Sequence, residues 1–493
     1  MPVPEILAAE KIPYGQETVN FSSGGKNIFV ISDLHMASGL NANNNYEGTE
    51  NFFADSSFSR FLNHLQSKQG GKKAILLING DFIDFLRVIN LPETDADFSL
   101  WQKILADIGI SKTKEELQTS ITAKEKKYGM KTNDYKSVYR LHICANGHPQ
   151  VFESLARWLL NGNSIIITKG NHDLEWYWKA VRDYLRLLFA QRISSIQNSG
   201  IENILQQIVI PGLTFVDDKL IIDGKIYVEH GHRYENFCWP GNPAVVNNGT
   251  ELNLPFGSFL NRYLINYVEL AYTYIDNIRP GSNILPVLIR EKFPYAIKIL
   301  FYYLPFALEV IPKKQYKQAF RHLWHFVLMI VLPVGITAFA IWHTFHVNNI
   351  AADIPKTGNG NFILQQIFSV VKNFAFLSLS YFLGRLLIRL DISAPENLYV
   401  NAKKVFDSNR NLQLVTMGHT HNPQQENDNG KWYYNTGTWM PIYELDAADV
   451  RLEKTFTFLH ITYDSNGNIN QTELQRWNDD ASRDEQLVLM DTE

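Results

Sequence analysis

Cysteine is scarce in this chain of 493 residues, which contains only Cys144 and Cys238. Neither cysteine belongs to a C-x-x-C pattern. This scarcity argues against a disulfide framework and against a zinc site built from thiolates, and it is typical of proteins of a reducing compartment.

A strong net charge and the pattern of a secretory signal are also not seen. The formal net charge is −4, which gives no electrostatic reason to expect a nucleic-acid partner. The first twenty residues have no basic start followed by an apolar run, so no secretory signal is expected. With 45% hydrophobic and 19% charged residues, the composition is that of a globular protein.

Five short apolar runs have the length and composition of strands that are covered on both faces. They are Asn27–Ser32, Ala74–Asn79, Ser164–Lys169, Lys225–His230 and Gln413–Gly418. Helix-like stretches such as 57–67 and 150–161 lie between them, so the chain is predicted to be an α/β protein of the α+β kind. Asp223-Gly224 predicts a tight hairpin turn within 215–229.

The length predicts a core that is interrupted by insertions. Residues 1–240 and 401–476 are expected to form the two parts of the core, and 91–149 a polar, lysine-rich helical insert. Residues 241–400 form an aromatic-rich, mostly helical insertion. Residues 477–493 carry six acids and one arginine and are expected to be a frayed acidic tail.

Each apolar run ends in, or is followed by, a cluster of residue types that commonly serve as metal ligands. The clusters are Asp33/His35, Asp81/Asp84, Asn171/His172/Asp173, His230/His232 and His419/His421. One cluster alone is weak, since D-x-H or G-N-H-D occurs in ordinary turns. Loops at the carboxyl ends of adjacent strands share one edge of a sheet, so the ordered set predicts that these side chains converge.

The expected ligands are imidazoles and carboxylates with one amide oxygen, and no sulfur. Such mixed sites suit Mn, Fe or Zn, and the sequence leaves the three open. Seven ligands are too many for one ion and suit two divalent ions that share a carboxylate. They are Asp33, His35, Asp81, Asn171, His230, His419 and His421.

The ordered motifs D-x-H, G-D-x-x-D, G-N-H-D, H-G-H and G-H-T-H resemble those of the calcineurin-like metallophosphoesterase superfamily. The resemblance covers roughly residues 26–238 and 411–461. Within the superfamily, V-E-H-G-H-R-Y (228–234), G-H-T-H-N-P (418–423) and Y-N-T-G-T-W (434–439) are most similar to the UDP-2,3-diacylglucosamine pyrophosphatase-like branch.

The resemblance implies a four-layer αββα sandwich with one metal at Asp33, His35 and His421. It places the other metal at Asn171, His230 and His419, with Asp81 bridging the two. His172 would then face the phosphoryl group as a catalytic residue, and Asp84 would fix its tautomer. The chain departs from the pyrophosphatase pattern at His172, where an arginine is common, and at His232, where an aspartate is expected. Both departures leave the substrate open.

Five further residues are assigned by their position. His232 is expected either to replace His230 as a ligand, or to contact the substrate or one of the metal-ligating side chains. Asp173 is expected to cap a helix that begins near Leu174. Asn435 either lines the site or has a plain turn role, and His142 and His148, remote from the clusters, are expected to be structural or exposed.

Two apolar segments in the large insertion, Phe326–Trp342 and Phe362–Phe382, predict a membrane hairpin within 323–383. Basic residues flank the pair on both sides, which predicts that the catalytic domain lies on the cytoplasmic face. These flanking residues are Lys313, Lys314, Lys317, Arg321, Arg385 and Arg389. The alternative is a soluble helical cap with a buried hairpin.

The predicted function is two-metal hydrolysis of a phosphoester or pyrophosphate bond in a lipid-linked or nucleotide-sugar lipid substrate. One alternative is a phosphatase or phosphodiesterase that acts on soluble nucleotides or phosphoproteins. The other is a non-catalytic scaffold of the same fold, which we would expect to have lost ligands.

Overall fold

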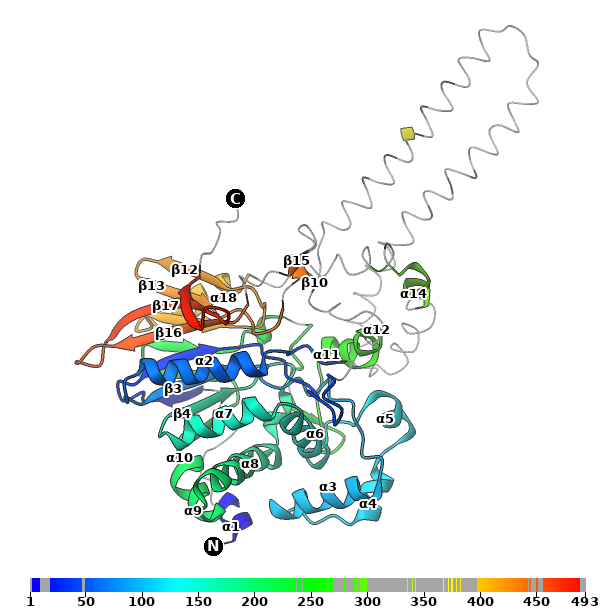
Figure 1. The fold of residues 1–493 in the computed structure, drawn as a ribbon. Helices are drawn as coiled ribbons and strands as arrows, with labels where there is room; N and C mark the ends of the chain where they lie inside the picture. Colours follow the sequence, from blue (N-terminus) through cyan, green and yellow to red (C-terminus); the bar gives the residue numbers. More distant parts are fainter. Residues whose placement is uncertain are drawn as a thin grey trace. The chain divides into compact units, whose positions relative to one another are not determined.

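The chain is a mixed α/β protein with two mixed sheets (Figure 1). Residues 1–279 with 395–493 form one compact unit, and 280–394 form a second. The first unit therefore includes 241–279, which the sequence analysis assigned to the large insertion. The computed structural model describes residues 2–8, 18–46, 49–235, 237–241, 243–269, 278–279, 288, 290, 292–298, 335, 339, 342, 367, 371, 374–375, 378, 382, 397–441, 443–444, 449–450 and 455–487.

A seven-stranded sheet carries the first three predicted strands as parallel neighbours: β2 (Asn27–Ile31), β3 (Ala74–Asn79) and β4 (Ser164–Thr168). The strand order is β18-β17-β16-β2-β3-β4-β5. The remaining strands are β5 (Leu213–Val216), β16 (Thr457–Tyr463), β17 (Ile469–Asn478) and β18 (Arg483–Gln486). The strand predictions for this sheet are confirmed.

A six-stranded sheet has the order β1-β6-β7-β11-β13-β12 and carries the other two predicted strands. β7 (Ile226–Val228) and β11 (Leu414–Met417) are parallel neighbours. The other members are β1 (Thr18–Phe21), β6 (Lys219–Ile222), β12 (Gln424–Asp428) and β13 (Lys431–Asn435). β6 and β7 form the predicted hairpin, and Asp223 and Gly224 have φ angles of 51° and 67°, as a tight primed turn requires.

The five predicted strands are predominantly apolar because both of their faces are buried. In β2, Ile28 and Val30 pack in a core that also contains Leu220 and Val228 of the six-stranded sheet, so the two sheets face each other. Phe29 and Ile31 point into the opposite core. That second core includes residues of α2 (Asp55–Lys68), α7 (Pro149–Leu160) and α8 (Lys179–Gln197), and α18 (Leu398–Ser408) packs on the outer face of the six-stranded sheet (Figure 1).

The insert 91–149 is helical, as predicted. Three of its helices begin at a capping box, in which a threonine at the N-cap pairs with an acid three residues later. Its helices are α3 (Asp95–Asp107), α4 (Lys114–Ser120), α5 (Ala123–Tyr128) and α6 (Asp134–Gly147).

Short elements complete the described parts of the first unit. They are α1 (Val3–Ala8), η1 (Leu174–Tyr177), α9 (Ile201–Ile204), η2 (Leu205–Val209), α10 (Ile210–Gly212), η3 (His232–Tyr234), β8 (Val245–Val246), β9 (Glu251–Leu252), α11 (Phe256–Leu260), η4 (Asn261–Ile265), α12 (Asn266–Glu269), β10 (Ile278–Arg279), β14 (Tyr443–Glu444) and β15 (Asp449–Val450). In the second unit the structure describes α14 (Phe293–Lys298).

The prediction of a frayed acidic tail is wrong for residues 477–486. β17 extends to Asn478, and β18 pairs with it antiparallel. The acids are held by basic side chains of α2, since Arg60 pairs with Asp479 and Lys68 with Asp484. Residues 488–493 lie outside the described part of the chain.

The predicted membrane hairpin, 323–383, lies almost wholly outside the described residues. Among the residues that the structure does describe, no helix has the length and apolar character needed to cross a bilayer.

His148 is buried and structural, as one of its two predicted roles requires. It lies between two carboxylates, with Nε2 3.0 Å from Glu50 Oε2 and Nδ1 3.0 Å from Asp55 Oδ1. Glu50 also accepts hydrogen bonds from the backbone N–H groups of Ala37 and Gly39. This cluster therefore fastens the loop that continues from His35.

We expect the His148 cluster to make stability depend on pH. Burial alone would lower the pKa of His148, but Glu50 and Asp55 raise it to about 9. Because the pKa is higher in the folded state, the stabilisation is complete below the ordinary value of 6.5 and is lost as the pH rises through about 9. Its loss should lower the free energy of unfolding by on the order of 3 kcal/mol. Urea unfolding of the wild type and of His148→Gln between the ordinary pKa of 6.5 and the raised value of about 9 measures this loss of stability. An equal pH dependence of the free energy of unfolding in the two proteins would contradict the expectation.

Candidate metal centre

The predicted site residues follow five strands that come from both sheets. Asp33 and His35 follow β2, Asp81 and Asp84 follow β3, and Asn171 and His172 follow β4. His230 follows β7, and His419 and His421 follow β11. Since β2, β3 and β4 are parallel neighbours, as are β7 and β11, their carboxyl ends bring these side chains together.

The backbone at the site is left-handed at five of the seven predicted ligands. Their φ angles are 54° at Asp33, 50° at His35, 51° at Asp81, 70° at His419 and 58° at His421. Residues with a side chain adopt this conformation infrequently, and it tends to collect at functional sites, where the surrounding structure enforces it.

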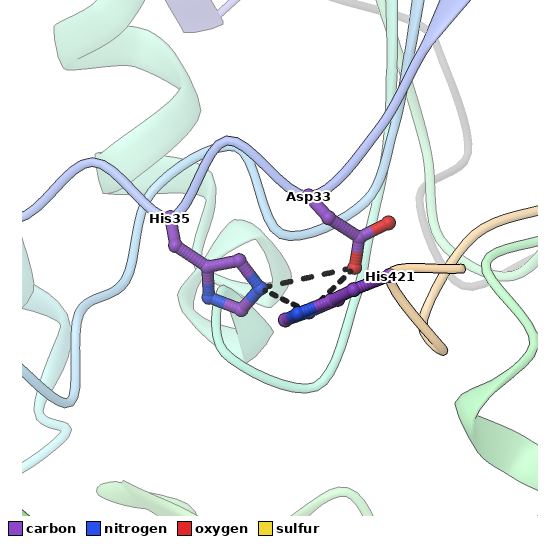
Figure 2. Close-up of side chains that lie close together, drawn as sticks. All are labelled: Asp33, His35 and His421. Atoms are coloured by element: carbon purple, nitrogen blue, oxygen red, sulfur yellow. Dashed lines mark hydrogen bonds and ion pairs between the residues drawn. The ribbon is translucent and has the colours of Figure 1, made fainter. Parts of the chain in front are cut away.

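Asp33, His35 and His421 form one group of donor atoms (Figure 2). His421 Nε2 lies 3.4 Å from Asp33 Oδ1, and His35 Nε2 lies 3.8 Å from the same oxygen. The two imidazole Nε2 atoms are 3.1 Å apart. Three donors that point to one place suit a divalent cation.

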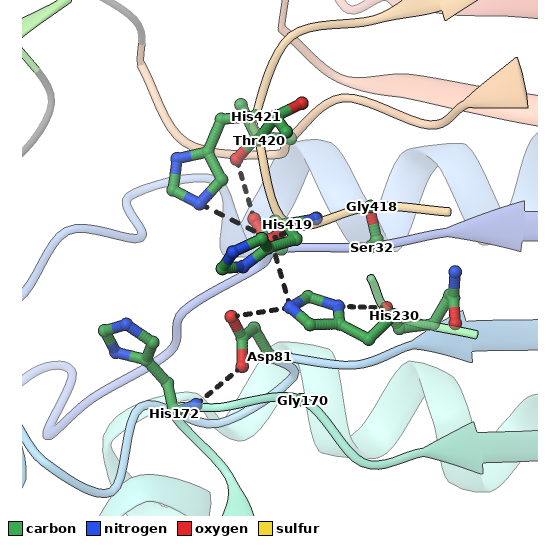
Figure 3. A network of polar contacts seen from close by, with 12 residues as sticks. Ser32, Asp81, Gly170, His172, His230, Gly418, His419, Thr420 and His421 are labelled. Atoms are coloured by element: carbon green, nitrogen blue, oxygen red, sulfur yellow. Dashed lines mark hydrogen bonds and ion pairs between the residues drawn. The ribbon is translucent and has the colours of Figure 1, made fainter. Parts of the chain in front are cut away.

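Asp81, His230 and His419 form a second group (Figure 3). His230 Nε2 lies 3.0 Å from Asp81 Oδ2, and that oxygen is also 3.6 Å from His35 Nε2 of the first group. Asp81 therefore lies between the two groups, where a bridging ligand must lie.

The second group and the neighbouring G-N-H-D loop carry donor atoms that suit a metal. Asn171 is 5% exposed, and its Oδ1 has no hydrogen-bond partner among the described residues. His230 Nδ1 lies 2.8 Å from the carbonyl oxygen of Asn79, an arrangement in which Nδ1–H donates and Nε2 is left for a ligand. The donor set of nitrogen and oxygen suits Mn, Fe or Zn equally.

The carboxylates and imidazoles of the site shift each other's pKa. Burial alone would raise the pKa of Asp33, but His230 and hydrogen bonds from His35 and His421 hold it well below its usual range. Asp81 is shifted in the same direction. Burial would lower the pKa of His35 and His230, yet the neighbouring carboxylates raise them to about 10 and about 9. Both carboxylates are thus ionised, as metal binding requires.

His172 lies beside these groups and not within them. Its Nδ1 is 2.7 Å from Asp84 Oδ2. Its backbone N–H donates to Asp81 Oδ1 at 2.8 Å (Figure 3). Burial would lower the pKa of His172, but Asp84 and Asp81 raise it. The ring is therefore oriented by Asp84 through Nδ1, and Nε2 is the nitrogen that Asp84 does not contact.

Close approach explains the glycines of two motifs. A Cβ on Gly170 would collide with the side chain and the backbone nitrogen of Asp81, and a Cβ on Gly418 would lie 2.6 Å from Asp33 Oδ2. The G-N-H-D and G-H-T-H loops therefore need glycine so that they can approach ligands supplied by other strands.

His232 is 3% exposed, and both of its ring nitrogens lack a hydrogen-bond partner among the described residues. Its ring centroid lies 5.4 Å from that of His230 and 6.4 Å from that of His419. Burial, together with these two imidazoles, holds the pKa of His232 well below its usual value. It is a neutral imidazole beside the second group, and both of its predicted roles stay open.

Asp173 does not cap a helix through its side chain, so that expectation is wrong. It precedes η1, but its carboxylate accepts from the backbone N–H groups of Phe82 and Gly170 and from Trp176 Nε1. These partners tie the G-N-H-D loop to the loop of Asp81. Burial and the charge of Asp81 raise the pKa of Asp173 to about 7.

Asn435 has a positioning role in its turn. Its Nδ2 donates to Gly418 O at 2.7 Å and to Thr420 Oγ1 at 3.1 Å, so it holds the loop of His419 and His421. His142 contacts the Tyr184 hydroxyl at 2.6 Å and is structural.

Two residues near the site escaped sequence reasoning. Arg87 Nε donates to Asp84 Oδ2 at 3.0 Å, and Glu235 Oε2 lies 3.1 Å from His419 Nε2. Neither residue is part of a repeated pattern, although each lies three residues beyond a predicted site residue. That spacing was the only signal in the sequence.

Comparison of the sequence with models of known protein families finds no match, and comparison with curated proteins finds none either. The assignment of a chemical class therefore depends on the motifs and on the geometry of the site.

We expect metal binding to release protons. His35 and His230, with pKa values raised to about 10 and about 9, carry protons at neutral pH, and a metal ligand must be a neutral imidazole. Two protons should leave, so the apparent Mn²⁺ affinity should rise up to about a hundredfold per pH unit below both pKa values. Calorimetry of the apoprotein in buffers of different ionisation enthalpy measures the release, with His142→Ala as control. An affinity that does not change with pH would contradict the expectation.

Proposed function

We propose that the protein is a two-metal phosphoesterase with the four-layer αββα sandwich of the calcineurin-like metallophosphoesterase superfamily. The observation that carries the proposal is the pair of donor groups that Asp81 links. The two facing sheets, with helices packed on both outer faces, also support it.

One metal would be held by Asp33, His35 and His421, and the other by Asn171, His230 and His419. Asp81 would bridge them. A bound metal pair would supply charge for the phosphoryl oxygens and a lowered pKa for the attacking water. The residues themselves supply the geometry, since the ionised carboxylates and the rings oriented by Asn79 and Asp84 point to one region.

His172 would act as the general acid. Its Nδ1 is committed to Asp84, and its raised pKa keeps a proton on the ring at neutral pH. A proton on Nε2 can then pass to the leaving oxygen, while the Asp84 carboxylate stabilises the charged ring before the transfer.

The proposed substrate is a lipid-linked phosphoester or a nucleotide-sugar lipid such as a UDP-diacylglucosamine, met at the cytoplasmic face of a membrane. Four large, exposed apolar side chains favour contact with a lipid surface. Ile367, Val371, Phe374 and Phe382 are 54%, 60%, 72% and 65% exposed. Their spacing of four, three and eight residues places them on one face of a helix. The basic residues that flank 323–383 favour the cytoplasmic side.

Two variants test the function together. Asp81→Asn removes the bridging carboxylate, so it should lower metal content and abolish hydrolysis. His172→Ala should keep about two metals per chain and slow turnover by roughly 10²–10⁴. Elemental analysis and hydrolysis of UDP-diacylglucosamine, bis-p-nitrophenyl phosphate and p-nitrophenyl phosphate measure both effects. A metal-loaded wild type that hydrolyses none of the esters is a scaffold, and hydrolysis of soluble esters alone favours the soluble-substrate alternative.

The membrane part of the proposal has its own test. Replacing Ile367, Val371 and Phe374 with serine removes three exposed apolar side chains, and should weaken binding to anionic phospholipid vesicles by more than about tenfold. Flotation with vesicles measures it. The matched control is Leu100→Ser with Val400→Ser, which removes exposed apolar residues of the first unit. Equal flotation of the two variants would count against these residues as the lipid contact.

A further inference from the structure

A row of buried charges leads from Glu269 to His172. Glu269 Oε1 accepts from Arg87 NH2 at 3.2 Å, and Glu269 Oε2 pairs with Arg87 NH1, so the pair is bidentate. Arg87 Nε donates to Asp84 Oδ2 at 3.0 Å, and the same oxygen lies 2.7 Å from His172 Nδ1. Three contacts thus join a residue of α12 to the proposed general acid.

Glu269 and the two residues that lie between it and His172 are shielded from water. Asp84 is 0%, Arg87 1% and Glu269 2% exposed. Opposite charges in such surroundings interact strongly, and the loss of one partner leaves the other charge buried and uncompensated. Glu269, together with the carbonyl oxygen of Thr49 at 3.5 Å from the guanidinium, therefore helps to orient Arg87 toward Asp84.

A second side chain of α12 contacts the backbone of the loop that carries Asp84. Asn266 Nδ2 donates to Leu86 O at 2.8 Å, and Leu86 N donates to Asp84 Oδ1 at 3.1 Å. Asp84 Oδ2 additionally lies 3.3 Å from His35 Nδ1, so one carboxylate orients both the proposed acid and a proposed metal ligand.

We propose that Glu269 is a positioning residue that acts on His172 and His35 through Arg87 and Asp84. The proposal rests on the proposed function of the site. It couples the rate of hydrolysis to the position of α12, a helix that precedes the second unit in the sequence. If α12 moves away, Arg87 loses its second carboxylate, and Asp84 loses a fixed partner.

The test compares Glu269→Gln with a matched control, Glu251→Gln, which removes an acid paired with Lys131 at 2.7 Å in the same stretch of chain. At saturating Mn²⁺, Glu269→Gln should lower kcat about tenfold with KM changed less than about twofold, because it alters the orientation of the acid and not substrate contacts. The control should match wild type.

A double-variant cycle separates positioning from general damage. In an Asp84→Asn background, Glu269→Gln should cause no further loss of kcat, since the residue through which it acts is gone. An equal loss in both backgrounds, or an unchanged kcat in the single variant, would overturn the proposal. If Glu269→Gln does not fold, Glu269→Asp takes its place, with a loss of about threefold expected and an unchanged kcat overturning the proposal.

A readout without turnover keeps the two proposals distinguishable. Because Asp84 also orients His35, Glu269→Gln should weaken Mn²⁺ binding to the apoprotein by about threefold or more, whereas Glu251→Gln should not. If the wild type hydrolyses no phosphoester, the proposed function fails. The Mn²⁺ affinity of Glu269→Gln relative to the wild type then tests whether Glu269 positions His35. If the wild type is active and Glu269→Gln changes neither kcat nor affinity, the role of Glu269 alone is refuted.

Discussion

Two carboxylates withdrawn from water, Asp33 and Asp81, impose the main constraint on this structure. They are 0% and 1% exposed, and a buried carboxylate without compensation costs several kcal/mol. The neighbouring imidazoles of His35, His230 and His421 supply the compensation. The same interactions raise the pKa values of His35 and His230 while those of the two carboxylates fall. A pair of cations would neutralise the same carboxylates and release the imidazole protons. The acids and the histidines are therefore needed together.

This constraint explains why the motifs stand at strand ends. A buried charge needs partners held at fixed distances, and the ends of parallel strands supply fixed positions from segments far apart in the chain. The left-handed backbone at Asp33, His35 and Asp81 is strained, and the glycines at 170 and 418 stabilise little by themselves. The apolar core between the sheets and the core beneath α2, α7 and α8 offset these costs.

Much of the fold could be predicted because local chemistry and tertiary burial agree. Continuous apolar runs became strands buried on both faces, Asp223-Gly224 formed its turn, and the strand ends brought the site residues together. The prediction failed where a distant partner decides. The Asp173 carboxylate accepts hydrogen bonds from the Phe82 N–H and from Trp176. Two of the acids after residue 476 form ion pairs with Arg60 and Lys68 of α2. No sequence period reports such contacts, and the same is true of the pairing of Arg87 with Glu269.

Burial of the ion pair between Arg87 and Glu269 costs desolvation free energy, so its presence calls for an explanation. A buried ion pair is often no better for stability than apolar residues of equal volume, so stability alone gives little reason to bury Arg87 and Glu269 behind Asp84. An apolar side chain at position 87 would leave the Asp84 carboxylate with the backbone N–H of Leu86 and two imidazoles as partners. The charge of an imidazole depends on pH, whereas a guanidinium stays charged. The arginine thus gives Asp84 one cationic partner whose charge does not depend on the state of His172, and Glu269 pairs with that arginine. The requirements of the site therefore extend beyond its ligands to a helix that the sequence motifs do not include.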